Sequence, residues 1–152
     1  MTERILVVGP SWVGDMVMAQ TLFKSLVTRR SGAIVDVMAP AAALAVAERM
    51  PEVNRSILFD MGHGELRLSY RRKFAHKLES AGYNQAIVLP NSAKSALVPF
   101  FAGIKKRTGF IGEMRYFLLN DVRKLDKERL PRMIDRFLSL GSLNDSERSH
   151  PI

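Results

Sequence analysis

Short apolar runs alternate with amphipathic segments along most of the chain. Five of these runs are rich in Val, Ile, Leu or Phe, and most are followed directly by Gly, Pro or Asp. Runs of this length and composition, bounded by turn residues, are typical of buried β-strands. The predicted strands are Arg4–Val8, Ile34–Met38, Arg55–Phe59, Gln85–Leu89 and Arg107–Ile111.

The segments between the strands have apolar residues at helical spacing, as one buried helix face requires. The predicted helices are Asp15–Thr28, Ala41–Arg49, Leu66–Ser80, Lys94–Ala102 and Lys127–Leu140. Pro131 lies close enough to the start of the last helix to be tolerated there. Gly32 and Gly82 follow two helix ends, where a left-handed backbone is commonly needed.

Strands that alternate with helices predict an α/β fold, a Rossmann-like parallel sheet with helices on both faces. We expect one domain over residues 1–141 and a frayed polar tail over residues 142–152. In such a sheet, ligands bind at the carboxyl ends of the strands. The loops at those ends are Gly9–Gly14, Ala39–Ala42, Asp60–Glu65, Pro90–Ser95 and Gly112–Asp121.

The composition narrows the class of protein. Of 152 residues, 47% are hydrophobic and 25% charged, which are the values of a globular domain. Without cysteine, neither a disulfide framework nor a cysteine-ligated metal site forms. The apolar run near the N-terminus is too short for a signal peptide, and no stretch approaches the roughly 20 apolar residues of a membrane span.

The chain is basic, with 23 Lys+Arg against 15 Asp+Glu and a formal net charge of +8. Such a surface favours polyanions, meaning nucleic acid, anionic lipid or a phosphorylated substrate, although charge alone is equally compatible with solubility. The predicted helix Leu66–Ser80 concentrates the basic residues Arg67, Arg71, Arg72, Lys73, His76 and Lys77.

The loop after the first strand reads GPSWVGD and ends at Asp15. A phosphate-binding P-loop needs Lys and then Ser or Thr after its second glycine, whereas Asp15 and Met16 stand there. Two interpretations of Asp15 remain open: it caps the helix by accepting backbone N–H groups, or it takes a proton from a sugar hydroxyl. Trp12 beside it offers a ring face on which a sugar can stack.

Several longer motifs resemble one family. GPSWVGDMVMAQ, DVMAP, RMPEVN, GHGE and LPNSAKSALVPFFAGIKKRTGFIGEMRYFLLNDVRKLDK resemble glycosyltransferase family 9, the heptosyltransferases of bacterial lipopolysaccharide synthesis, from about Ile5 to about Arg136. The resemblance implies one half of a two-domain GT-B fold. It also implies transfer of heptose from ADP-heptose to the heptose of the lipopolysaccharide inner core, with inversion at the anomeric carbon.

The resemblance also implies roles for particular residues. An inverting transfer needs one base, which in this family is the Asp of a Gly-Asp pair, here Gly14-Asp15. The first domain of the family holds the acceptor, which carries carboxylates and lipid A phosphates. The expected acceptor-binding residues are Ser11, Trp12, Gly14, Arg71, Arg72, Lys73, Asn91, Ser92, Lys94 and Arg115.

The donor ADP-heptose would bind a second domain, which we expect to be absent from this chain. The isolated chain is therefore expected to be inactive, and no cofactor or metal is expected in it. The expected partners are the inner-core and lipid A acceptor and, by peripheral contact, the cytoplasmic side of the inner membrane. Met133, Phe137 and Leu140 on the last helix would face the second domain, and self-association through that face is left open.

Two other interpretations compete with this one. The first is a basic nucleic-acid-binding module, which would need exposed aromatic residues such as Tyr70, Phe74 and Tyr83 among its basic residues. The second is a non-catalytic scaffold domain.

Overall fold

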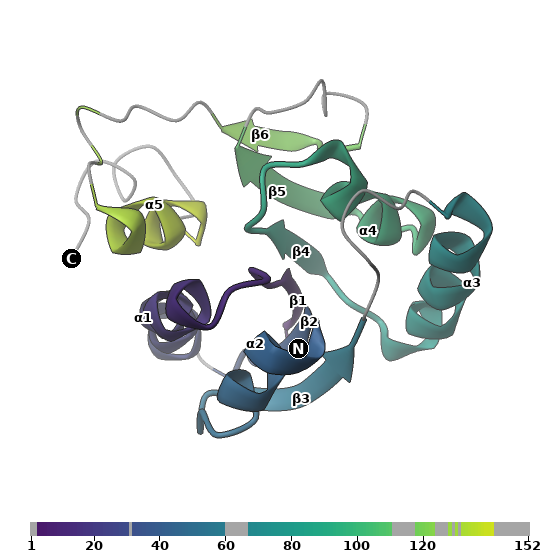
Figure 1. The fold of residues 1–152 in the computed structure, drawn as a ribbon. Helices are drawn as coiled ribbons and strands as arrows, with labels where there is room; N and C mark the ends of the chain where they lie inside the picture. Colours follow the sequence, from purple (N-terminus) through teal and green to yellow (C-terminus); the bar gives the residue numbers. More distant parts are fainter. Residues whose placement is uncertain are drawn as a thin grey trace.

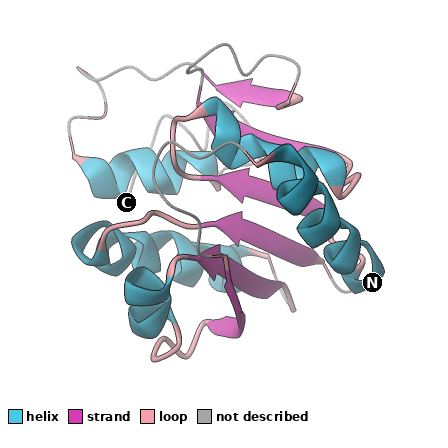
Figure 2. Ribbon diagram, turned by 45° about the vertical axis from the view of Figure 1, so that its right-hand side comes forward, coloured by secondary structure: helices cyan, strands magenta, loops and turns pink. Residues whose placement is uncertain are grey.

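A computed structural model describes residues 3–30, 32–59, 67–110, 118–123, 128, 130 and 132–141. Within these residues six strands form one sheet in the order β3-β2-β1-β4-β5-β6, and every neighbouring pair is parallel. Figure 2 shows the strand arrows pointing in one direction between two layers of helices. The strands are β1 Arg4–Val8, β2 Ile34–Ala39, β3 Val53–Leu58, β4 Gln85–Val88, β5 Lys106–Phe110 and β6 Asp121–Arg123.

The helices cover both faces of the sheet (Figure 1). Side chains of α1, α2 and α5 pack in a core on one face, while those of α3 and α4 pack in a second core on the other. The helices are α1 Val13–Arg29, α2 Ala41–Ala47, α3 Leu68–Leu78, α4 Leu97–Phe101 and α5 Met133–Leu140, with short 3₁₀ helices η1 Glu79–Ala81 and η2 Ala93–Ala96. The prediction of a Rossmann-like α/β fold is confirmed.

The strand order places a topological switch between β1 and β4. The chain leaves β1 toward β2 and β3 on one side, and it returns through α3 to β4 on the other. Val8 is in register with Met38 of β2 and with Val88 of β4, so the three strands end at the same edge. The loops after β1 and β4 therefore begin side by side.

The predicted number of five strands is wrong, because β6 adds a sixth. Its three residues, Asp121–Arg123, have no apolar run that marks a strand in the sequence. The strand is instead specified by tertiary contacts: it pairs with β5 from Thr108 to Phe110. Gly32 and Gly82 have φ angles of 77° and 69°, as predicted for residues after helix ends.

The last helix is part of the domain core. Phe137 and Leu140 are 5% and 0% exposed and pack in the same core as the buried face of α1. A Cβ atom at Gly141 would lie 2.7 Å from Leu22 Cδ1, which shows how closely the end of α5 approaches α1. The prediction that Phe137 and Leu140 form an exposed docking surface is therefore wrong, and of the three residues only Met133 is exposed.

Polar side chains connect α5 to the sheet at the amino ends of the strands. Arg30 donates to Gln85 Oε1 at 2.6 Å and to the Gly141 carbonyl at 2.7 Å. Gln85 in turn donates to Thr108 Oγ1 at 2.7 Å. Thr108 donates to Asp121 at 2.9 Å. Arg123 donates to the same carboxylate at 2.8 Å and to the Ser139 carbonyl of α5 at 2.7 Å. We call Arg30, Gln85, Thr108, Asp121 and Arg123 the amino-edge network.

Candidate active site at the carboxyl edge of the sheet

The loop between β1 and α1 is held tightly against β2. The Gly9 amide donates to the Met38 carbonyl at 2.8 Å. A Cβ atom at Gly9 would lie 2.8 Å from Met16 Cε and 3.4 Å from that carbonyl oxygen, so only glycine fits without displacement. The close contact fixes where α1 starts relative to the sheet.

Asp15 lies in the first turn of α1 and is half-buried. The helix begins at Val13 with Trp12 as its N-cap residue, so the predicted start at Asp15 is wrong by two residues. The Asp15 carboxylate makes no hydrogen bond or ion pair with any residue that the structure describes. The helix-capping interpretation thus loses its support, while the positive end of α1 still stabilises the negative charge.

Three further residues of the predicted site, Ser11, Trp12 and Gly14, precede Asp15 in the sequence. Trp12 is 68% exposed, an unusual position for so large an apolar side chain. Gly14 lies inside the helix, and a Cβ atom there would have no neighbour within 4 Å. Glycine lowers helix stability by up to about 1 kcal/mol relative to alanine, and no contact within the chain requires it at this position. Ser11 is half-buried in the same loop.

The loop after β4 lies next to this first loop, because the Leu89 amide donates to the Val8 carbonyl at 3.1 Å. Asn91 is exposed, and Ser92 is half-buried. Ser92 Oγ caps η2 by accepting from the Ser95 amide at 3.3 Å. The structure therefore brings Asn91 to the same edge as Asp15, at the switch point where open α/β sheets bind their ligands.

The predicted basic residues of α3 fall into two groups. Arg71 is 6% exposed, donates to the Lys94 carbonyl at 3.1 Å and lies 5.4 Å from the centre of the Phe59 ring. Burial lowers the pKa of its guanidinium from the ordinary value. Arg71 therefore holds the β4 loop against α3, a positioning role that its basic character did not indicate.

Arg72 and Lys73 are exposed on α3, which covers the face of the sheet opposite to α1. They stay predicted acceptor contacts. Arg115 of the predicted site lies outside the described residues, as do His63, Glu113 and Met114.

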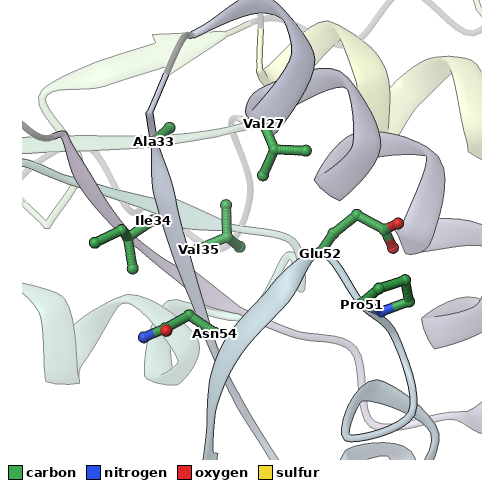
Figure 3. A pocket seen from close by; sticks show the side chains of 7 residues that line it. All are labelled: Val27, Ala33, Ile34, Val35, Pro51, Glu52 and Asn54. Carbon is green, nitrogen blue, oxygen red and sulfur yellow. The ribbon is translucent and has the colours of Figure 1, made fainter.

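A hollow in the surface lies away from these loops. It has a volume of about 450 Å³ and opens near the amino ends of β2 and β3, at the edge opposite to Asp15 (Figure 3). Its polar groups are occupied: Glu52 accepts from Gln20 at 2.8 Å, and Asn54 donates to Asp36 at 2.9 Å. The polar groups of this hollow are thus already paired within the chain, and the predicted site residues lie at the other edge of the sheet.

Two observations bear on the alternatives. Tyr83 is buried and donates to Asp36 Oδ2 at 2.6 Å, and Phe74 is half-buried against the second core. Neither ring is available to stack on bases, which removes two of the three aromatic residues that a nucleic-acid-binding module would use. Among the described residues, no group of three or more potential metal ligands occurs, and no helix is both long and apolar enough to cross a bilayer.

The fold and the switch-point site define a Rossmann-like domain with a carboxylate at its ligand-binding edge. Known proteins narrow the class further. The model of glycosyltransferase family 9 (heptosyltransferase) matches residues 71–145. The chain is 58% identical over 138 residues to lipopolysaccharide heptosyltransferase 2 of Escherichia coli (strain K12), a match that covers 91% of this chain and 40% of the relative.

Solved structures of heptosyltransferases and related enzymes have the same fold as this chain. The E. coli ADP-heptose lipopolysaccharide heptosyltransferase II superposes with a TM-score of 0.84 at 54% identity, over 91% of this chain and 40% of that one. A family 9 glycosyltransferase from Veillonella parvula superposes with a TM-score of 0.81 at 15% identity, over 99% of this chain and 42% of that one, a likeness that concerns the fold alone. The chain thus matches glycosyltransferase family 9 over residues 71–145, and it spans about 40% of the length of the curated relatives it matches.

Proposed function

We propose that this chain is the acceptor-binding half of an inverting heptosyltransferase. The enzyme transfers heptose from ADP-heptose to the heptose of the lipopolysaccharide inner core. Residues 1–141 form the acceptor domain, and ADP-heptose binds the part of the relatives' length that this chain does not span. The observation that carries the proposal is a carboxylate at the switch point, unpaired among the described residues, in a chain 58% identical to a lipopolysaccharide heptosyltransferase 2.

In this mechanism the acceptor hydroxyl attacks the anomeric carbon of the heptose as its proton passes to Asp15. The bond from that carbon to the ADP oxygen breaks in the same step, and the bonding electrons leave with ADP. A single in-line displacement inverts the anomeric centre and needs one base. Ser11, Trp12, Gly14, Asn91, Ser92 and Lys94 line the acceptor beside Asp15, while Arg72, Lys73 and Arg115 contact its carboxylates or phosphates.

Several observations support these roles. Asp15 and Asn91 follow adjacent strands that end at one edge, and Trp12 presents an exposed ring beside the carboxylate. Guanidinium groups bind phosphate and carboxylate in bidentate geometry, and ammonium groups bind them as point charges. A lipid-linked acceptor also places the enzyme at the cytoplasmic face of the inner membrane, where we propose peripheral contact.

A chimaera tests the proposal. The matched segment of this chain replaces its counterpart in lipopolysaccharide heptosyltransferase 2 of E. coli, and transfer of heptose from ADP-heptose to an inner-core acceptor is measured. We expect turnover within about tenfold of the E. coli enzyme, and none from the isolated chain, because holding two substrates across a cleft supplies much of the rate. A folded chimaera without transfer would favour the non-catalytic scaffold and contradict the proposal.

A further inference from the structure

The exposed side of α3 combines apolar and basic side chains, and the proposed acceptor contacts of Arg72 and Lys73 do not account for its exposed apolar residues. We propose that this face binds the headgroup region of an anionic lipid bilayer. We call Leu68, Tyr70, Arg72, Lys73 and Lys77 the α3 surface. The inference rests on the proposed function only in that a lipid-linked acceptor gives the contact a purpose.

The apolar part of the α3 surface lies in the first turn of the helix. Leu68 is 49% exposed and Tyr70 is 37% exposed. The Tyr70 ring is supported from behind, because its centroid lies 5.8 Å from that of Phe59 and 6.3 Å from that of Phe74. Tyr70 is therefore held in place, with part of its ring turned to solvent.

The basic part continues along the same helix. The segment from Arg67 to Leu78 contains five Lys or Arg residues and no Asp or Glu. Arg72, Lys73 and Lys77 are exposed, and none of them forms an ion pair with a described residue. The first acid after them, Glu79, lies 3.2 Å from His76 at the far end of the helix. No ion pair with a described residue thus neutralises the charges of Arg72, Lys73 and Lys77.

This combination fits a bilayer better than a polynucleotide. An exposed leucine gains nothing from a phosphodiester backbone, whereas it gains from contact with acyl chains. Tyrosine prefers the membrane interface, and each lysine or arginine near an anionic surface adds electrostatic attraction. Base stacking would need further exposed rings, but Phe74 and Tyr83 are covered.

The position of the α3 surface agrees with this role. The first turn of α3 follows β3 and therefore lies at the carboxyl edge of the sheet, the edge that carries Asp15. A bilayer in contact with Leu68 and Tyr70 would thus lie near the acceptor site and away from the amino-edge network.

Sedimentation with vesicles tests the proposal on the 152-residue chain. We expect binding to vesicles of phosphatidylglycerol and phosphatidylcholine in equal parts, loss of binding in high salt and no binding to phosphatidylcholine alone. Leu68→Ser/Lys77→Glu should lower the partition coefficient about tenfold. The matched control is Val17→Ser/Lys24→Glu, which makes the same change at exposed positions of α1 on the other face and should alter it less than about threefold. Urea unfolding midpoints verify that both variants are folded.

The outcomes separate this inference from the proposed function. The proposal that the α3 surface binds lipid would be wrong if the parent and the α3 variant bound vesicles equally, or if both variants lost binding equally. It would also be wrong if the chain bound duplex DNA but not anionic vesicles. In the chimaera, Leu68→Ser/Lys77→Glu should preserve transfer to a lipid-free acceptor oligosaccharide. If the parent chimaera fails to transfer heptose while vesicle binding follows the expected pattern, the proposed function is wrong and the proposal of lipid binding by the α3 surface is supported.

Discussion

At the scale of single residues, Asp15 is notable because its carboxylate makes no hydrogen bond or ion pair with a residue that the structure describes. We predict that Asp15→Asn in the chimaera lowers turnover by about 100- to 10,000-fold, the usual loss when a positioned general base is removed. The melting temperature should shift by only a few degrees. Glu48→Gln, an exposed change at the end of α2, serves as the control and should leave turnover unaltered. Turnover of the Asn variant within about threefold of the parent would contradict the assignment of Asp15 as the base.

Gly14 poses a different question, since the helix would be more stable with alanine there. We predict that Gly14→Ala raises the free energy of unfolding of the chain by roughly 0.5–1 kcal/mol. The same change should lower kcat/KM of the chimaera, because we propose that the acceptor approaches through the open space over Gly14. Gly82→Ala is the matched control, and it should destabilise the chain because Gly82 has a φ of 69°. A stabilised Gly14→Ala variant with full activity would show that nothing approaches Gly14.

Some residue roles could be predicted from the sequence and others could not. The residues around Gly14-Asp15 left two interpretations of Asp15 open, a helix cap or a base, and the resemblance to glycosyltransferase family 9 favoured the base. The burial of Arg71 was not predictable, because an arginine in a run of basic residues has the pattern of a solvated helix face. Only the fold brings Phe59 and the Lys94 carbonyl to its guanidinium.

At the scale of secondary-structure elements, apolar runs located five of the six strands to within about two residues. They failed for β6, whose strand conformation depends on pairing with β5 and on the bonds of Asp121 and Arg123 rather than on apolar residues. The start of α1 was also missed, because Val13 and Gly14 do not have the composition of a first helical turn, whereas the start of α2 at Ala41 was predicted.

The amino-edge network leads to a prediction about acid stability. Burial alone would raise the pKa of Asp121, but hydrogen bonds from Arg123 and Thr108 and the charges of Arg123 and Lys106 outweigh it, so the pKa lies below its ordinary value. A carboxyl with a lowered pKa stabilises the fold above its unfolded pKa, and this stability is lost as the pH falls through the folded value.

We therefore predict that Asp121→Asn lowers the free energy of unfolding by roughly 1–3 kcal/mol at pH 7, because Arg123 and Thr108 lose a charged partner. The difference between variant and parent should narrow below about pH 4, where the parent carboxyl also becomes protonated. Urea unfolding at a series of pH values measures it. A difference that stays constant down to about pH 2.5 would contradict the role of the ionised carboxylate.

At the scale of the whole molecule, the amino-edge network and the proposed acceptor site lie at opposite edges of the sheet. The amino edge carries a connected set of buried polar groups that joins α1, β4, β5, β6 and α5. The carboxyl edge carries Asp15 and Asn91, and we propose that the acceptor binds there. Substitutions at the two edges should therefore separate into those that change unfolding and those that change transfer.

The last prediction concerns where the folding unit ends. If α5 belongs to the core, Phe137→Ala removes a side chain that is 5% exposed and should lower the free energy of unfolding of the whole domain by about 3–5 kcal/mol. Met133→Ala, at a position 37% exposed on the same helix, should cost less than about 1 kcal/mol. Both variants should sediment as the parent does, since neither side chain would hold two copies together. If α5 were instead a docking face, Phe137→Ala would weaken self-association and leave the unfolding free energy nearly unchanged. Urea unfolding and sedimentation velocity on the same two variants distinguish these results.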